Sequence, residues 1–164
     1  MAELGSLREP YYDVREAVRF PFSAAPAIPA IEAHPLKDRI ALVEGSSTAP
    51  EVIAQVKAMV DPGENVLIQL DSNHTYGHFY QELEAYAGLV TPGSYIVATD
   101  GFMFDLADVP RGFAAWDQDN PMAAARDFSL KYPEFVLEAP EWVFNESGLD
   151  QSITHWSGSW LKRK

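Results

Sequence analysis

The chain contains no cysteine, and this absence removes three kinds of chemistry at once. Disulfide bonds, thiolate metal sites and a cysteine nucleophile are all excluded. Basic residues are also scarce, because 12 Lys and Arg stand against 24 Asp and Glu, which gives a formal charge of −12. A protein this acidic repels phosphate backbones and anionic lipid, so we expect no nucleic-acid partner. The basic residues 162–164 are interpreted as a solvated tail.

Long apolar runs are missing too. No stretch approaches the roughly 20 apolar residues that span a bilayer, and the N-terminus lacks the pattern of a signal peptide. We therefore expect a cytoplasmic protein with no membrane span. The length of 164 residues and the hydrophobic fraction of 47% are those of one ordinary globular domain.

The N-terminal region is poor in glycine and rich in proline. Gly5 is the only glycine before Gly45, and residues 20–30 contain three prolines. Such a density of proline excludes a central strand and breaks a helix. We interpret residues 1–30 as a Pro-rich leader or arm, with a short helix near residues 13–19, and residues 31–164 as a single domain.

Beyond residue 30, strand and helix patterns alternate. The strands are predicted at residues 39–44, 65–71, 94–99, 134–138 and 153–156, and the last two are joined by a turn at 145–148. The helices are predicted at residues 49–60, 75–88 and 121–131, with Thr48 and Asn120 as caps of the first and third. Residues 101–120 read as a long loop rich in large apolar groups. This order predicts an α/β fold with a mostly parallel sheet flanked by helices and an antiparallel C-terminal strand pair.

Two carboxylates follow successive predicted strands. Asp71 ends the strand at 65–71, Asp100 follows the strand at 94–99, and His74 lies three residues after Asp71. In open α/β sheets, ligands bind outside the carboxyl ends of the strands, so these side chains form a candidate site. Histidine is also a suitable base for a substrate hydroxyl near neutral pH.

Each candidate also has a structural interpretation. Asp71 would cap the following helix, Asp100 would be a turn residue before glycine, and His74 would be a polar residue at a helix start. The helical spacing of His74, His78 and Glu82 suits a transition metal, but it is more typical of a solvated face. We interpret His34 and His155 as structural.

Several motifs in order resemble the cephalosporin hydroxylase / rhamnosyl O-methyltransferase family. They are residues 31–40 (IEAHPLKDRI), 44–47 (EGSS), 70–75 (LDSNHT), 95–101 (YIVATDG) and the ending at 156–164. The resemblance implies a Rossmann-like, class I S-adenosylmethionine-dependent methyltransferase. It also implies a divalent cation, usually Mg²⁺, with Asp71 and Asp100 in the positions of its ligands. Glu44, Gly45, Ser46 and Ser47 match the segment that contacts the adenine end of the cofactor, although a turn with a helix cap explains the same residues. We also expect Asp71 to contribute to cofactor binding.

The chain departs from that family at two places. Thr99 stands where better-known members carry a glutamate, which removes one carboxylate from the predicted cation site. The first strand with its Gly-rich turn, and the second strand with its terminal acid, have no counterpart in residues 1–30. The chain thus resembles the C-terminal two-thirds of the fold. The missing strands would lie between those at 39–44 and 65–71, so two apolar sheet edges are left open and self-association is expected.

Three functions remain open at this point. The first is an O-methyltransferase acting on a hydroxyl of a sugar or small natural product, with His74 and Asp71 as catalytic residues. The second is a truncated, non-catalytic remnant that does not bind the cofactor. The third is a metal-dependent hydroxylase that uses Asp71, His74 and His155, although the usual His-x-Asp spacing of such sites is absent. We expect a small-molecule or glycoside acceptor and a homo-oligomer.

Overall fold

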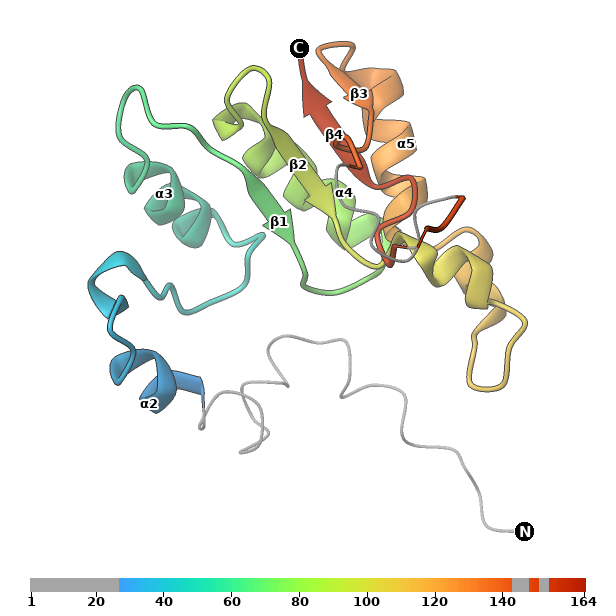
Figure 1. Ribbon diagram of the computed structural model, residues 1–164, viewed down its shortest axis with the longest axis horizontal. Coiled ribbons are helices and arrows are strands. Elements are labelled where there is room, and N and C mark those ends of the chain that lie inside the picture. Colours follow the sequence, from blue (N-terminus) through green and yellow to red (C-terminus); the bar gives the residue numbers. More distant parts are fainter. Residues whose placement is uncertain (1–26, 143–147, 151–153) are drawn as a thin grey trace, which may run out of the picture.

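Figure 1 shows the computed structural model, which describes residues 27–142, 148–150 and 154–164. In chain order, the elements are α2 (Ala27–Glu32), η1 (Lys37–Arg39), α3 (Pro50–Ala58), β1 (Ile68–Leu70), α4 (Tyr76–Tyr86), η2 (Ala87–Leu89), β2 (Tyr95–Ala98), η3 (Gly101–Leu106), η4 (Ala114–Asp117), α5 (Pro121–Lys131), β3 (Phe135–Leu137) and β4 (Trp160–Arg163). None of the described helices is long and apolar enough to cross a membrane. The short helix predicted near residues 13–19 and most of the turn predicted at 145–148 lie outside the described residues.

The four strands form one sheet in the order β1-β2-β4-β3. β1 and β2 are parallel, with Leu70 opposite Ala98, whereas β4 is antiparallel to both β2 and β3. Three strands therefore run in one direction and β4 runs against them. This arrangement confirms the predicted mostly parallel sheet with an antiparallel C-terminal pair. In Figure 1, α4 and α5 lie behind the sheet, and α3 lies beside β1 at the edge.

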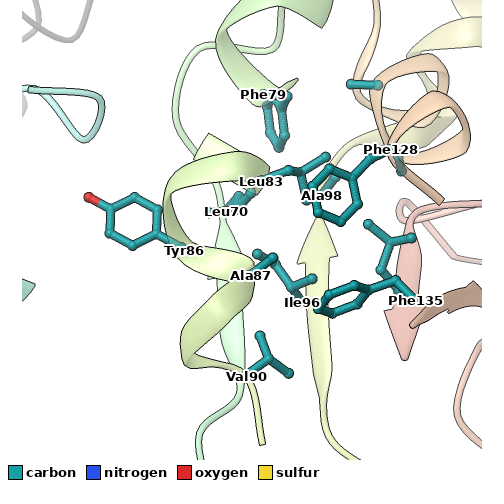
Figure 2. Packing of buried hydrophobic residues seen from close by; sticks show 13 residues of the cluster. Leu70, Phe79, Leu83, Tyr86, Ala87, Val90, Ile96, Ala98, Phe128 and Phe135 are labelled. Carbon is teal, nitrogen blue, oxygen red and sulfur yellow. The ribbon is translucent and has the colours of Figure 1, made fainter. Parts of the chain in front are cut away.

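The core lies between the sheet and the two helices α4 and α5. The predicted apolar face of α4 is confirmed, because Phe79 and Leu83 are fully buried and Tyr86 nearly so. Figure 2 shows Phe79 and Leu83 on the side of α4 that faces the sheet and α5, and the cluster that they join contains buried residues of β1, β2, β3 and α5. The predicted start of α5 is also confirmed, because Asn120 is its N-cap and its Oδ1 accepts a hydrogen bond of 2.8 Å from the Ala123 N–H.

The strand predicted at residues 39–44 does not form. Arg39 ends η1, Ile40 has an extended backbone, and residues 40–44 belong to no helix or strand. Ile40 and Leu42 are 42% and 57% exposed, although β-branched and apolar residues usually enter a sheet. Propensity alone does not make a strand, because a strand needs a neighbour to receive its backbone hydrogen bonds.

The last strand lies at Trp160–Arg163 instead of the predicted 153–156, and the residues before it form a turn. Burial of Leu161 between β2 and β3 explains the position, because this side chain is opposite both Ile96 and Leu137. The interpretation of 162–164 as a solvated tail was therefore wrong. The Arg163 guanidinium donates hydrogen bonds to the carbonyl oxygens of residues 88 and 90, which ties β4 to η2 and the residue after it.

Three local predictions also need correction. Pro29 lies within α2, so the Pro-rich stretch does not exclude a helix, because proline is tolerated in the first helical turn. The N-cap of α3 is Ala49 and not Thr48, whose hydroxyl is paired with that of Ser46 at 3.1 Å. The segment predicted as a long loop contains η3 and η4, with Met103 buried and Phe104 exposed.

Candidate active site at the carboxyl edge of the sheet

The register of β1 and β2 brings Asp71 beside Thr99. Leu70 is opposite Ala98, so the residue after each strand lies next to the other. The Thr99 hydroxyl is 2.8 Å from the Leu70 carbonyl oxygen and 3.0 Å from Asp71 Oδ1. A single hydroxyl hydrogen serves one of these acceptors at a time. Thr99 thus orients the Asp71 carboxylate from a buried position.

Asp100 reaches the same place through an unusual backbone conformation. Its φ of 57° and ψ of 29° are left-handed, which is uncommon for a residue with a side chain. A Cβ on the next residue, Gly101, would lie 2.0 Å from Ser159 Oγ and 2.3 Å from the Ser157 carbonyl oxygen. Close packing against the turn before β4 therefore fixes the chain at this point, and the strained conformation directs Asp100 toward the site.

His74 lies between the two carboxylates. Its Nε2 is 3.3 Å from Asp71 Oδ1 and 3.2 Å from Asp100 Oδ2. The imidazole ring also stacks on the buried ring of Phe79, with 5.7 Å between the centroids. The structure therefore brings together the three residues that the sequence singled out, with their ligand atoms within 4.8 Å of one another.

The site concentrates negative charge in a protein that is already acidic. Two carboxylates lie on either side of one imidazole, and no Lys or Arg forms an ion pair with them among the residues that the structure describes. Such a cluster favours a bound cation, because a cation lowers the repulsion between the carboxylates.

Asp71 does not cap α4. The N-cap of α4 is Thr75, whose side chain makes no capping bond, and the Tyr76 N–H instead donates a hydrogen bond of 2.7 Å to Asp119 Oδ1. Asp119 therefore caps α4 from the segment before α5. The structural role considered for Asp71 is filled by another residue, and its carboxylate faces Thr99 and His74.

The spacing of His74, His78 and Glu82 predicted one shared helix face, but the structure places them in two separate groups. His74 precedes α4, whereas His78 Nε2 lies 3.5 Å from Glu82 Oε1 and 3.2 Å from Ser47 Oγ. Glu82 is buried, 1% exposed, and accepts a hydrogen bond of 2.7 Å from Ser72 Oγ. Sequence reasoning took these residues for a solvated face and missed Glu82. The available signal was its position beside the apolar residues 79, 83 and 86 of the same helix.

A groove of about 430 Å³ extends from this region along β1. Its lining combines an apolar part with a polar part near the carboxyl end of β1, and it consists of Ser47, Val56, Val60, Val66, Leu67, Ile68, Gln69, Leu70, Asp71, Ser72, Glu82, Tyr86 and Leu89. In Figure 2 the Tyr86 ring points away from the other labelled side chains. Its hydroxyl donates to the Ser47 carbonyl oxygen, and burial, followed by the charge of Glu82, raises the pKa of Tyr86.

A sequence model of the rhamnosyl O-methyltransferase/CmcI family matches residues 24–164. The chain belongs to this family. The match covers most of the chain and begins within the segment interpreted as a leader. No curated protein and no solved structure matches the chain. Membership in an O-methyltransferase family supports a methyltransferase-like role, a general use of S-adenosylmethionine and a small-molecule acceptor.

The residues of this chain fit the family's divalent cation better than they fit S-adenosylmethionine. Asp71 and Asp100 offer carboxylate oxygens that a divalent cation accepts, and His74 adds a nitrogen donor. Of the residues predicted to bind S-adenosylmethionine, Ser47 and Asp71 line the groove along β1. Glu44 and Gly45 are exposed, and no Gly-rich turn follows a strand within the described ranges. The cation site is therefore better formed than the cofactor cradle.

The hydroxylase alternative receives no support from the position of His155. Its ring packs against Phe102 with 4.6 Å between centroids, and its carbonyl oxygen accepts the Phe102 N–H at 3.2 Å. Among the described residues, the cluster of possible metal ligands consists of Asp71, His74 and Asp100, so it contains one histidine. A two-histidine, one-carboxylate site would need a second imidazole there.

Proposed function

We propose that this chain is an S-adenosylmethionine-dependent O-methyltransferase that acts on a hydroxyl of a sugar or small natural product. The observation that supports it best is the position of His74, whose Nε2 is 3.3 Å and 3.2 Å from two carboxylates at the ends of adjacent parallel strands. A base held at a strand-end cleft is suited to an acceptor hydroxyl.

In this proposal, His74 donates its Nε2–H to the carboxylates, and its Nδ1 takes the proton of the acceptor hydroxyl when that oxygen is methylated. S-adenosylmethionine supplies the methyl group when bound. Asp71 and Asp100 stabilise the imidazolium, since each lies within hydrogen-bond distance of Nε2. Thr99 holds Asp71 in position, so the charge is already oriented before the proton moves.

A divalent cation such as Mg²⁺ would be held by Asp71 and Asp100, with Thr99 in place of a third carboxylate. It would lower the pKa of the acceptor hydroxyl. Under this arrangement His74 donates a hydrogen bond to the same carboxylates and acts as a positioning residue. The two roles of His74 differ in whether activity depends on added metal.

The test is a calorimetric titration of S-adenosylhomocysteine into the purified chain, with and without Mg²⁺. Micromolar binding supports the proposal, and we then expect His74→Ala to retain this binding but lose methyl transfer by about 10²–10⁴-fold, the usual contribution of an acid–base residue. His34→Ala, which removes an exposed histidine outside the carboxylate cluster, is the matched control. No binding by a chain with a cooperative thermal transition contradicts the proposal.

The alternative is a non-catalytic remnant of the fold, and one observation favours it. β1 is an edge strand of the sheet, and no described strand lies on the side away from β2 to carry a cofactor cradle. A remnant would fold and bind a divalent cation at Asp71 and Asp100 without binding S-adenosylhomocysteine. The same titration therefore separates the two functions.

A further inference from the structure

The side of β1 opposite β2, here called the open edge, presents unpaired main-chain groups. The Leu70 carbonyl oxygen accepts the Thr99 N–H, so Leu70 faces β2, and the Val66 carbonyl oxygen accepts the Thr91 N–H from the turn before β2 on the same side. Because main-chain groups alternate along a strand, Leu67 and Gln69 direct theirs to the open edge. Within the described ranges, no strand pairs with them. The open edge is a template for one more strand.

The same chain carries an unpaired strand-like segment, residues 40–43 (IALV). Its first residue is extended, with φ −117° and ψ 118°. Ile40 and Leu42 are two residues apart, so in a strand they share one face, and both are largely exposed. The groove along β1 is lined by apolar side chains of α3 and β1, including Val56 and Leu67. Two exposed apolar side chains and an open apolar groove are complementary surfaces.

Charge selects the direction in which residues 40–43 would pair with β1. Arg39 precedes the segment and Glu44 follows it, whereas Asp71 and the buried Glu82 lie at the carboxyl end of the groove. Parallel pairing would bring Glu44 to those two carboxylates. Antiparallel pairing brings Arg39 to Asp71 and moves Glu44 to the other end. The antiparallel direction is therefore favoured.

Antiparallel pairing within one copy is excluded by chain length. Ser47 is connected to the carboxyl end of β1, because its hydroxyl contacts His78, His78 pairs with Glu82, and Glu82 accepts a hydrogen bond from Ser72. Glu44 is three residues away, a reach of roughly 10 Å, whereas residues 66–71 span about 17 Å. Glu44 of the same copy therefore does not reach the amino end of β1, and the added strand must come from a second copy.

We propose that two copies of this chain associate by exchanging residues 40–43, each copy adding this segment antiparallel to β1 of the other. Arg39 opposite Asp71 sets the register, which places Ala41 opposite Gln69 and Leu42 opposite Ile68. Leu42 then enters the groove, and Arg39 of the second copy contributes a positive charge beside the candidate site. The contact is reciprocal, as a two-fold dimer requires. This inference does not depend on methyltransferase activity.

The absence of cysteine provides a clean test. Ala41→Cys and Gln69→Cys are made in separate chains, mixed and mildly oxidised. Opposed residues in antiparallel strands are about 5.5 Å apart between Cα atoms, which is within the reach of a disulfide. We expect a disulfide-linked dimer containing one chain of each kind. Ala41→Cys mixed with Leu137→Cys, on the opposite edge strand β3, is the matched control and should not cross-link.

Three results would overturn the proposal. One is an intrachain disulfide in a monomeric Ala41→Cys/Gln69→Cys double variant, which would mean that each copy fills its own groove. Another is a homodimer of Gln69→Cys alone, which would mean that β1 pairs with β1. The last is a monomer at every concentration in sedimentation velocity, with no cross-link between the mixed chains.

A second measurement uses proline, which removes the N–H that the added strand would need. Gln69→Pro should weaken the dimer at least tenfold in sedimentation equilibrium, whereas Leu137→Pro on β3 should not. If thermal unfolding shows that Gln69→Pro does not fold, Leu42→Asp takes its place, because Leu42 is already exposed in the single copy. Unchanged dimerisation of a folded variant contradicts the exchange.

Discussion

Replacing Asp119 and Asp71 separately by alanine distinguishes a structural carboxylate from a functional one. Asp119 Oδ1 accepts the Tyr76 N–H at 2.7 Å, at the first turn of α4. Loss of a capping side chain costs about 1 kcal/mol, and loss of a negative charge at a helix N-terminus costs roughly 0.3–1 kcal/mol more. We expect Asp119→Ala to lose about 1.3–2 kcal/mol of unfolding free energy. For a chain of this size, that corresponds to roughly 3–8 °C in Tm.

Asp71→Ala should cost less than about 0.5 kcal/mol. Its side chain is largely exposed, and the Thr99 hydroxyl keeps the Leu70 carbonyl oxygen as an acceptor at 2.8 Å. Both variants remove one negative charge, so the general repulsion in this acidic chain changes equally in the two. Urea unfolding at pH 7 measures the difference. If Asp71→Ala is as destabilising as Asp119→Ala, then Asp71 is a structural residue and the reasoning for the site fails.

Three further predictions follow from other contacts. Hydrogen bonds from Lys131 and then Tyr132 lower the pKa of Glu84 below its ordinary 4.5, so its contribution to stability is present above that pH and disappears as the pH falls through the lower folded value. Glu84→Gln should therefore be less stable than the parent at pH 7, and urea unfolding should show the gap closing in acid; a constant gap would contradict this. Gly101→Ala should lose about 1–3 kcal/mol of unfolding free energy in the same assay, because its Cβ would lie 2.0 Å from Ser159 Oγ. An unchanged unfolding free energy would mean that the turn before β4 moves to accept the methyl group at little cost. Asp100→Asn should weaken Mn²⁺ or Mg²⁺ binding at least tenfold by calorimetry, whereas equal affinity would remove Asp100 from the cation site.

The parts of the fold that depend on local pattern were predictable from the sequence. The apolar face of α4 and the Asn120 cap of α5 form as expected. β1 and β2 also form within the residues predicted for them, before Asp71 and Asp100. The candidate site was predictable for the same reason, because parallel neighbouring strands bring the residues after them together.

The failures concern pairing between distant parts of the chain. Residues 40–43 have strong strand propensity, but propensity does not supply a neighbour. Conversely, residues 162–164 were interpreted as a solvated tail, but Trp160–Arg163 forms a central strand, because Leu161 packs between β2 and β3. The cap of α4 by Asp119 was equally inaccessible, since it joins residues 43 positions apart. Such contacts depend on the assembled sheet and not on a sequence window.

The segment between β2 and α5 is fixed at both ends and exposed in the middle, which has an evolutionary consequence. Gly101 packs too closely to accept a side chain. A Cβ added to Gly112 would lie 1.9 Å from the Leu106 carbonyl oxygen, so this position does not accept one either. Between those points, residues 108–111 are exposed. Insertions and substitutions there leave both anchors and the helix caps intact. Sequence drift among related chains should therefore collect in this short tip, where changes in length and chemistry are tolerated without loss of the fold.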